Sequence, residues 1–187
     1  MNILKKPLVL SMASMLLMSA SYLHAQQTVS YTYNDNGQIL TIDGSRTDVS
    51  DSSSYTYNAE GYRASITNAL GHIITLSDFN GRGQAQLITD ANGIDTRLTY
   101  HVRGWLLSSE VVDPADTGDG SLNARTDYTY NHVGNITRIT LPNGVFLNYD
   151  YDTSNRLVAI SNNLGEKISY TLDNAGNRLS QTLAGST

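Results

Sequence analysis

Cysteine is absent from all 187 residues of the chain. This absence excludes a disulfide framework, a lipid-modified N-terminal cysteine and a thiol nucleophile. Phenylalanine occurs only twice and tryptophan once, whereas tyrosine occurs twelve times. A conventional core would use phenylalanine and leucine more heavily, so tyrosine serves a repeated local purpose here. Stability must come from packing and strand pairing alone.

Positive charge is also scarce. The formal net charge is −5, with 40% apolar and 16% charged residues, a composition typical of a globular chain. Removal of the segment 1–25 would take away Lys5 and Lys6, leaving a net charge of −7 and Lys167 as the last lysine. The nine arginines are spread about one per turn. Nucleic-acid binding needs clustered basic residues, so we expect no nucleic-acid partner.

The segment 1–25 is typical of a signal peptide. Lys5 and Lys6 precede an apolar segment over 7–23, and residues 23–25 (Leu-His-Ala) offer a cleavage site. Serines interrupt the apolar segment and no charged stop-transfer flank follows, which makes an uncleaved membrane anchor the weaker alternative. We therefore predict a signal peptide over 1–25. The mature chain is expected to cross the inner membrane, to be secreted, at the cell surface or periplasmic, and to have no membrane span after cleavage.

One phrase, Tyr-x-Tyr-Asn/Asp-x-x-Gly, recurs through the rest of the chain and indicates a repeat architecture. Three nearly identical copies begin at Tyr31, Tyr55 and Tyr128. Four weaker copies are Leu76–Gly81, Tyr100–Gly104, Tyr149–Asn155 and Tyr170–Gly176. The sequence therefore predicts an array of about seven units over 26–187.

The last position of each phrase defines the phase of the array. These positions are Gly37, Gly61, Gly81, Gly104, Gly134, Asn155 and Gly176. Successive positions are twenty or slightly more apart, except for one longer step from Gly104 to Gly134. Two polar, turn-rich insertions, near 45–54 and 113–125, account for the extra length and are predicted to be loops.

Each unit has the pattern of a β-hairpin. In the first, Tyr31 and Tyr33 alternate with Thr32 and so share one face of a strand. The following Asx-x-x-Gly segment suits a type I turn that ends in a left-handed bulge residue, a place that Gly fills best and Asn tolerates. An aliphatic return strand follows, as at 38–42. The third unit lacks both tyrosines and is interpreted as a decayed repeat.

A second turn closes the units and leads into the next strand. Such turns are predicted at Asp43-Gly44, 68–71, 90–93, 141–144 and 162–165. No apolar pattern of helical period extends over ten positions after the leader, so no helix is expected. The predicted fold class is all-β: tandem antiparallel hairpins that form one twisted, curved open sheet of a dozen or more short strands.

The phrase, followed two positions later by an aliphatic residue as at Ile39, Leu106, Ile136 and Leu157, resembles the YD repeats of bacterial RHS proteins and teneurins. The resemblance spans about 31–183. It implies a long β-sheet wound into a hollow shell, which in polymorphic toxins encloses an effector polypeptide. Asp113-Pro114 lacks the glycine of the processing motif of that family, so no protease residues are carried over.

Seven hairpins are few for a closed shell of this type. Two interpretations follow: the chain is a truncated piece of a longer protein, or it docks by strand addition onto another repeat protein. The expected partners are therefore other YD/RHS repeat segments or an enclosed effector polypeptide.

Three candidate sites have alternative interpretations. The acidic segment 113–120 could supply oxygen ligands for calcium, although its aspartates stand three apart and a solvated loop explains it better. His72, His101 and His132 show no paired metal-ligand spacing, and no nucleophile elbow or phosphate loop occurs. A row of tyrosines that includes Tyr130 could stack on glycans, but sheet cohesion explains its regular phase better.

The sequence thus favours a structural shell segment without an enzymatic activity, a catalytic site, a metal or a cofactor. A glycan- or cell-wall-binding adhesion module and a secreted hydrolase are the second and third hypotheses.

Overall fold

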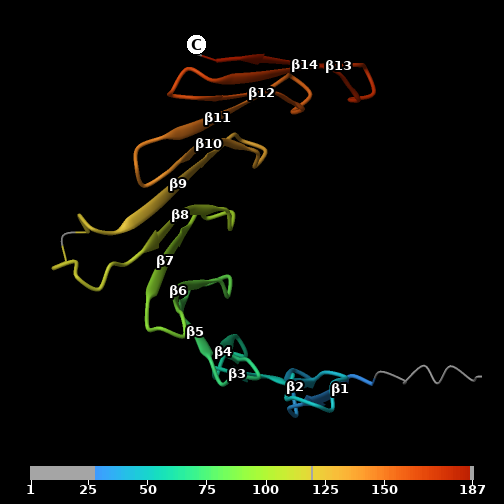
Figure 1. Cartoon of the computed structure of the whole chain (residues 1–187), viewed down its shortest axis with the longest axis vertical. Coiled ribbons are helices and arrows are strands. Elements are labelled where there is room, and N and C mark those ends of the chain that lie inside the picture. The colour runs from blue at the N-terminus through green and yellow to red at the C-terminus, as the bar shows by residue number, and fades with distance from the viewer. Residues whose placement is uncertain (1–27, 119, 186–187) are drawn as a thin grey trace, which may run out of the picture.

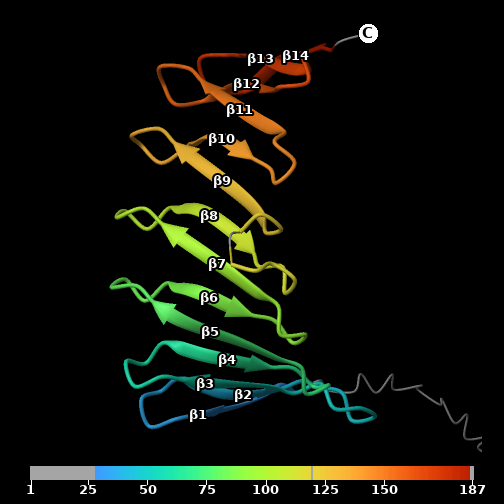
Figure 2. The ribbon, with the colours of Figure 1, turned by 90° about the vertical axis from the view of Figure 1, so that its left-hand side faces the viewer.

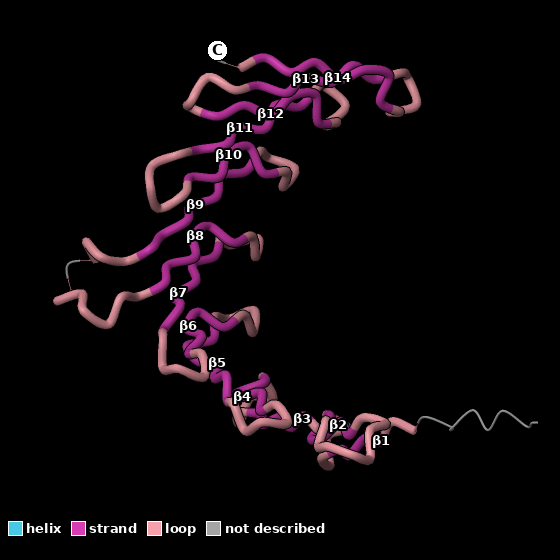
Figure 3. Tube along the Cα trace, in the orientation of Figure 1, coloured by secondary structure: helices cyan, strands magenta, loops and turns pink. Residues whose placement is uncertain are grey.

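The computed structural model of the chain describes residues 28–118 and 120–185. These residues form fourteen strands in one antiparallel sheet, in which every strand pairs with its neighbours in the sequence. Figure 3 shows strands and loops but no helix within this part of the chain. The strands are β1 (Ser30–Tyr33), β2 (Ile39–Asp43), β3 (Ser53–Tyr57), β4 (Arg63–Thr67), β5 (Ile73–Phe79), β6 (Ala85–Thr89), β7 (Asp95–Tyr100), β8 (Leu106–Val111), β9 (Ala124–Tyr130), β10 (Ile136–Thr140), β11 (Phe146–Tyr151), β12 (Leu157–Asn162), β13 (Lys167–Leu172) and β14 (Arg178–Ala184).

The predicted all-β class is confirmed, and the sheet is open and curved. It bends into a C shape from β1 to β14 (Figure 1), and its first and last strands do not pair with each other. A view turned by 90° shows the strands lying one above another, with the connections alternating between the two side edges (Figure 2). Within the described residues, no helix is long and apolar enough to cross a membrane. The predicted signal peptide lies outside the described residues.

The repeated phrase forms the turn that was predicted from it. The N–H of Gly37 donates to the carbonyl of Asn34 at 2.9 Å, and the N–H of Gln38 donates to the Asn34 side-chain oxygen at 2.9 Å. The pairing of β1 with β2 shifts register between Thr32 and Tyr33, as a bulge requires. In the sixth hairpin Asn155 fills the glycine place with φ of 60°, which confirms the prediction that Asn can substitute there.

The third hairpin corrects the predicted phase. Its turn closes at Gly83 (φ 76°), whose N–H donates to the carbonyl of Asn80 at 2.9 Å, and Gly81 is an interior turn residue. Phe79 therefore occupies the place of the second tyrosine, and the unit is less decayed than its sequence suggested. Asp78, with φ of 53°, is an extra residue in β5 before Phe79. With Gly83 as the closing position, the steps on its two sides become nearly equal.

The connections between hairpins follow the prediction at 68–71, 90–93, 141–144 and 162–165, where the chain turns directly from one strand into the next. The predicted tight turn at Asp43-Gly44 is wrong, because the chain leaves β2 there into a longer loop over 44–52. Asp51 organises this loop, since its carboxylate accepts the backbone N–H of Arg46 at 3.1 Å.

Both loops are shorter than the predicted insertions. Ser53 and Ser54 pair with β2 and so belong to β3, and Ala124 and Arg125 pair with β8 and so belong to β9. The physical reason is that polar residues are well tolerated on an exposed sheet face, and strand pairing extended through them. The second loop therefore covers 112–123.

The two faces of the sheet differ in chemistry. One face carries apolar cross-strand pairs such as Tyr55 opposite Ile66. The other carries hydroxyl pairs: the side chains of Thr56 and Ser65 lie 2.6 Å apart, and equivalent pairs recur in the first, fourth and seventh hairpins. Such alternation follows from the two-residue period of a strand.

Very little of this sheet is fully buried. Among the described residues, the buried side chains are Ala85, Ala159 and Ser108, with exposed fractions of 9%, 4% and 1%. No second layer of described residues covers either face, so most apolar side chains are only half-buried. Cohesion must therefore come from strand pairing and from contacts between successive hairpins.

Candidate functional site

The surfaces where one hairpin meets the next carry the most regular chemistry of the molecule. We number the hairpins 1 to 7, from β1–β2 to β13–β14, and call the last residue of each repeated phrase the turn glycine, including Asn155. Each of the six junctions joins the return strand of one hairpin to the first strand of the next. The contacts at these junctions recur at the same positions of the repeat.

The second tyrosine of a hairpin reaches back to the preceding hairpin. The hydroxyl of Tyr57 donates to the carbonyl of Ile39 at 2.8 Å, and that of Tyr130 donates to Leu106 at 2.7 Å. Tyr151 makes the same bond to Ile136 at 2.8 Å. The acceptor is always the residue two positions after the turn glycine. Burial raises the pKa of the Tyr130 and Tyr151 hydroxyls, which keeps them protonated as donors.

The residue directly after the turn glycine reaches forward to the next hairpin. Gln38 donates from its amide to the carbonyl of Gly61 at 2.7 Å, and Gln84 donates to Gly104 at 2.9 Å. Asn135 makes the corresponding bond to Asn155 at 3.4 Å. These amides satisfy the carbonyl of the next turn glycine, which the backbone bonds of the turn do not use.

Aromatic side chains occupy this same position in two hairpins. Tyr62 lies 5.1 Å from the ring of Phe79 between centroids, and Trp105 lies 5.3 Å from Tyr130. A Cβ added at Gly134 would stand 2.9 Å from Trp105, so glycine is needed there for space as well as for its φ of 100°. An aromatic ring therefore covers the next turn where an amide would otherwise bond to it.

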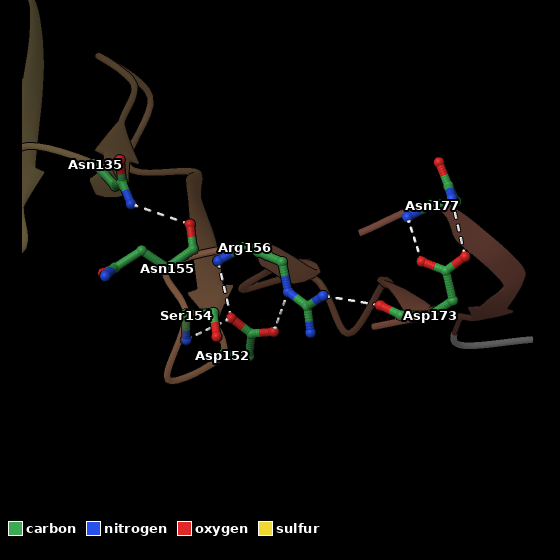
Figure 4. Close-up of polar contacts among 7 residues, drawn as sticks. All are labelled: Asn135, Asp152, Ser154, Asn155, Arg156, Asp173 and Asn177. Atoms are coloured by element: carbon green, nitrogen blue, oxygen red, sulfur yellow. Dashed lines mark hydrogen bonds and ion pairs between the residues drawn. The ribbon is translucent and has the colours of Figure 1, made fainter. Parts of the chain in front are cut away.

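Arginine at this position combines both hairpins in one network. Arg156 donates from Nε to Asp152 Oδ2 at 2.7 Å within its own turn, and from Nη1 to the carbonyl of Asp173 in the next hairpin at 2.8 Å. Figure 4 shows these bonds beside the bond from Asn135 to Asn155. The pKa of Asp152 is lowered, first by the backbone N–H of Arg156 and then by its guanidinium.

Two further arginines bridge neighbouring turns. Arg82 donates to the carbonyl of Val102 at 2.9 Å, and Arg103 donates to the carbonyl of His132 at 2.6 Å. Both stand directly before a turn glycine, and both acceptors stand two positions before the next one. For these two arginines, the regular spacing along the chain is thus explained by pairing with backbone carbonyls.

The acidic loop does not assemble the ligands that its composition suggested. Asp116 accepts backbone N–H groups from Gly118 at 2.7 Å, Gly120 at 3.1 Å and Leu122 at 2.9 Å. These bonds, led by that from Leu122, lower the pKa of its carboxyl group. The carboxylate organises the loop backbone. Across 28–118 and 120–185 no group of three or more His, Cys, Asp or Glu side chains could hold a metal ion.

The histidines occupy turns. The ring of His101 stacks on Trp105 at 5.2 Å, and its Nδ1 accepts the N–H of Arg103 at 3.1 Å. His132 lies in the next hairpin turn, whereas His72 lies in a connecting turn at the other side edge, with Nδ1 3.3 Å from Asn68 Nδ2. The structure therefore brings two of the three into neighbouring turns and leaves the third apart.

The tyrosine row is spread along the sheet. The hydroxyls of Tyr57, Tyr130 and Tyr151 are engaged in junction bonds, which is the cohesive role that its regular phase predicted. Sequence reasoning missed the position after the turn glycine. The sequence gives little indication of it, because Gln, Tyr, Trp, Asn and Arg all occur at this position. Their shared contact with the next hairpin is seen only in the tertiary structure.

A curved meander of Tyr-Asp-type hairpins, joined by repeating junction contacts, defines the class of YD-repeat sheet proteins. The sequence pattern of the Teneurin YD-shell family matches residues 6–182. The chain belongs to this family. No curated protein matches it.

Solved structures with a similar fold come from Tc toxins. The chain is similar to the crystal structure of TcdB2-TccC3 (17% identity, TM-score 0.59), covering 86% of this chain and 11% of that chain. It is also similar to TcdB2-TccC3-Cdc42 (16% identity, TM-score 0.57, 86% and 10%) and to a variant of the Tc holotoxin pore of Photorhabdus luminescens (16% identity, TM-score 0.53, 79% and 10%). The chain thus spans about a tenth of the length of these structures, and the likeness shows the fold.

Proposed function

We propose that the chain is a wall segment of an exported hollow shell that encloses a polypeptide. The observation that carries this proposal is the construction of the sheet: fourteen strands curve in one direction, and contacts of a few repeated kinds join successive hairpins. A sheet built in this way extends by adding further hairpins. Its function is to form a wall.

The use of the polar side chains supports the same role. Three of the polar side chains described above make hydrogen bonds within the sheet. Asp116 accepts backbone N–H groups of its loop, and Arg156 and Tyr130 each bond to a carbonyl of a neighbouring hairpin. An enzyme would concentrate perturbed acids and bases in one cleft. Here the lowered carboxyl pKa values include those of turn aspartates whose partners are backbone N–H groups and neighbouring side chains.

Export and enclosure rest on different support. Export rests on the signal-peptide pattern over 1–25. Enclosure rests on membership of the YD-shell family and on the fold likeness to the Tc toxin structures. The enclosed partner is a polypeptide effector, and other YD-repeat segments complete the wall around it.

The test is to isolate the tagged full chain from the cells that produce it, fraction by fraction, and to examine the particles by electron microscopy during protease digestion. We expect the chain in an exported fraction, as part of a hollow particle. A second polypeptide should survive digestion while the particle is intact and be degraded once denaturant opens the wall.

Two variants sharpen this test. Trp105→Ala removes the ring that covers the next turn and should make the enclosed polypeptide protease-sensitive. Leu122→Ala, at an exposed loop residue, should leave protection unchanged. Retention of the chain in the cytoplasm would refute export. Particles that are solid or extended, with no protected polypeptide, would refute enclosure.

A further inference from the structure

The register of the junctions is nearly constant along the sheet. In five of the six junctions, the same two positions of the repeat lie opposite each other. The residue four positions after the turn glycine of one hairpin pairs with the residue three positions before the second tyrosine of the next hairpin. In hairpin 7, Leu172 takes the place of that second tyrosine. Thr41 opposite Ser54 is one example. The junction into hairpin 3 differs by one residue, because Asp78 is inserted before Phe79. A junction is thus defined by a register rule and by the two side-chain contacts described above.

The last hairpin presents one half of such a junction. No described strand pairs with the outer edge of β14, and every residue of that strand is exposed. Asn177 stands directly after the turn glycine Gly176, the position from which Asn135 reaches forward to the next turn. Arg178 stands two positions after Gly176, where the carbonyl accepts a tyrosine hydroxyl at internal junctions. Leu179 on the same strand leaves 68% of its surface exposed.

The first hairpin presents the other half. No described strand pairs with the outer edge of β1, and Tyr33, its second tyrosine, is 56% exposed. The tyrosines at this position in hairpins 2, 5 and 6 donate to the preceding hairpin, and no described hairpin precedes Tyr33 to offer that acceptor. The carbonyl of Gly37 is likewise placed where an amide of a preceding hairpin would donate.

We propose that the outer edge of β14 binds the outer edge of β1 of a second copy of this chain, head to tail, as a seventh junction. The inference rests on the proposed function, whose wall it extends. The register rule pairs Ser180 with Ser30 of the second copy. Asn177 donates to the carbonyl of Gly37, and Tyr33 donates to the carbonyl of Arg178.

A second copy fits because the edge of β14 on one copy and the edge of β1 on the other have the strand direction that an internal junction has. An antiparallel pair of β14 with β1 places the start of β14, and so Asn177, beside the turn that follows β1. An antiparallel pair of two β14 strands places the start of each beside the end of the other, where Asn177 meets no turn. The head-to-tail contact is heterologous, so it repeats from copy to copy and builds a ring or a filament.

The absence of cysteine makes the register directly testable in the full chain. Two separate variants, Ser30→Cys and Ser180→Cys, are mixed in equal amounts and oxidised mildly. Residues directly opposite in an antiparallel pair have Cα atoms about 4.5 to 5.5 Å apart, within the range of a disulfide. We expect the mixed dimer to exceed either homodimer at least about ten-fold. Val29→Cys mixed with Ser180→Cys is the control, because Val29 is not opposite Ser180 in the proposed register, and it should yield little product.

The side-chain contacts have matched controls within the same hairpins. Tyr33→Phe and Asn177→Ala should each lower the mixed-dimer yield about five-fold, the factor expected for one lost hydrogen bond. Tyr31→Phe and Asn174→Ala, which change the same residue types without removing one of the proposed junction bonds, should leave the yield unchanged. Circular dichroism of every variant checks that the sheet persists.

Homodimers of either single-cysteine variant as the main product, or equal yields with Val29→Cys and Ser30→Cys, would overturn the head-to-tail contact. The absence of the mixed dimer from folded protein would also overturn it. If hollow particles that protect a polypeptide are still found, only this contact fails and the proposed wall stands. The proposed function fails separately when no such particle exists.

Discussion

Replacement of Gly134 by alanine tests whether the junction contacts hold the sheet together. Gly134 has φ of 100°, and an added Cβ would stand 2.9 Å from Trp105 Cζ2 and 3.1 Å from its Cε2. The indole must therefore move away, and it would lose its contact with Tyr130 at 5.3 Å. Gly144→Ala is the matched control, because Gly144 also has a left-handed φ, of 79°, but nothing lies within 4 Å of its added Cβ.

The two variants share one cost and differ in another. A left-handed backbone costs an alanine about 1 to 2 kcal/mol at either position. A displaced aromatic pair adds about 0.5 to 1.5 kcal/mol at Gly134 alone. We therefore expect a loss of unfolding free energy of about 2.5 kcal/mol for Gly134→Ala and about 1.5 kcal/mol for Gly144→Ala.

Urea denaturation measures this difference, and the single tryptophan reports where it arises. Trp105 is the only tryptophan of the chain, so its native-state emission reflects this junction directly. Gly134→Ala should shift the emission to longer wavelength, since the displaced ring gains solvent, while Gly144→Ala should leave it unchanged. Equal destabilisation by the two variants with identical emission spectra would refute the role assigned to the junction.

Three other predictions concern single polar contacts. Tyr130→Phe should lower the free energy of unfolding by about 1 kcal/mol, because it removes a 2.7 Å bond to the preceding hairpin, as measured by urea denaturation. Asp152→Asn should weaken the loss of stability in acid, measured as the change of melting temperature with pH. The pKa of Asp152 is lowered in the fold, so the stability that its carboxylate contributes is complete above the ordinary value of 3.8 and is lost as the pH falls through the folded pKa. Asparagine has no such titration and accepts the same turn bond at Asn34. Asp116→Ala should expose the loop over 112–123 to protease, since three backbone N–H groups lose their acceptor, and millimolar calcium should not change the melting temperature of the parent chain.

Each of these has a contrary outcome. The matched control Tyr128→Phe, at the first tyrosine of the same strand, should cost less than Tyr130→Phe, and equal costs would contradict the junction bond. An acid profile of Asp152→Asn that superimposes on the parent profile would contradict the assigned pKa shift. A rise in melting temperature with calcium that chelation reverses would show that the acidic loop binds the ion after all.

Local chemistry determined the hairpins. An Asx residue, a glycine or asparagine three positions later, and tyrosines that alternate with threonine specify a turn and two strands within a short stretch of chain. That is why 34–37, 131–134 and 152–155 form the turns predicted from them. The closing residue of the third turn was predicted wrongly, because Gly81 and Gly83 both follow Asn80 and either could end the turn locally. The pairing of β5 with β6 places Gly83 there.

The sequence by itself determined the all-β class, the number of hairpins and the cohesive use of tyrosine, because each depends on residues close together in the chain. Only the tertiary structure decided which residues join one hairpin to the next. Gln38 and Gly61, or Arg103 and His132, are distant in the sequence, and the strand register and the lengths of the intervening loops bring them together. The position after the turn glycine has no fixed residue type, since an amide, an indole or a guanidinium can each satisfy or cover the next turn. The role of this position follows from its constant placement beside the next turn, although the residue type at it varies.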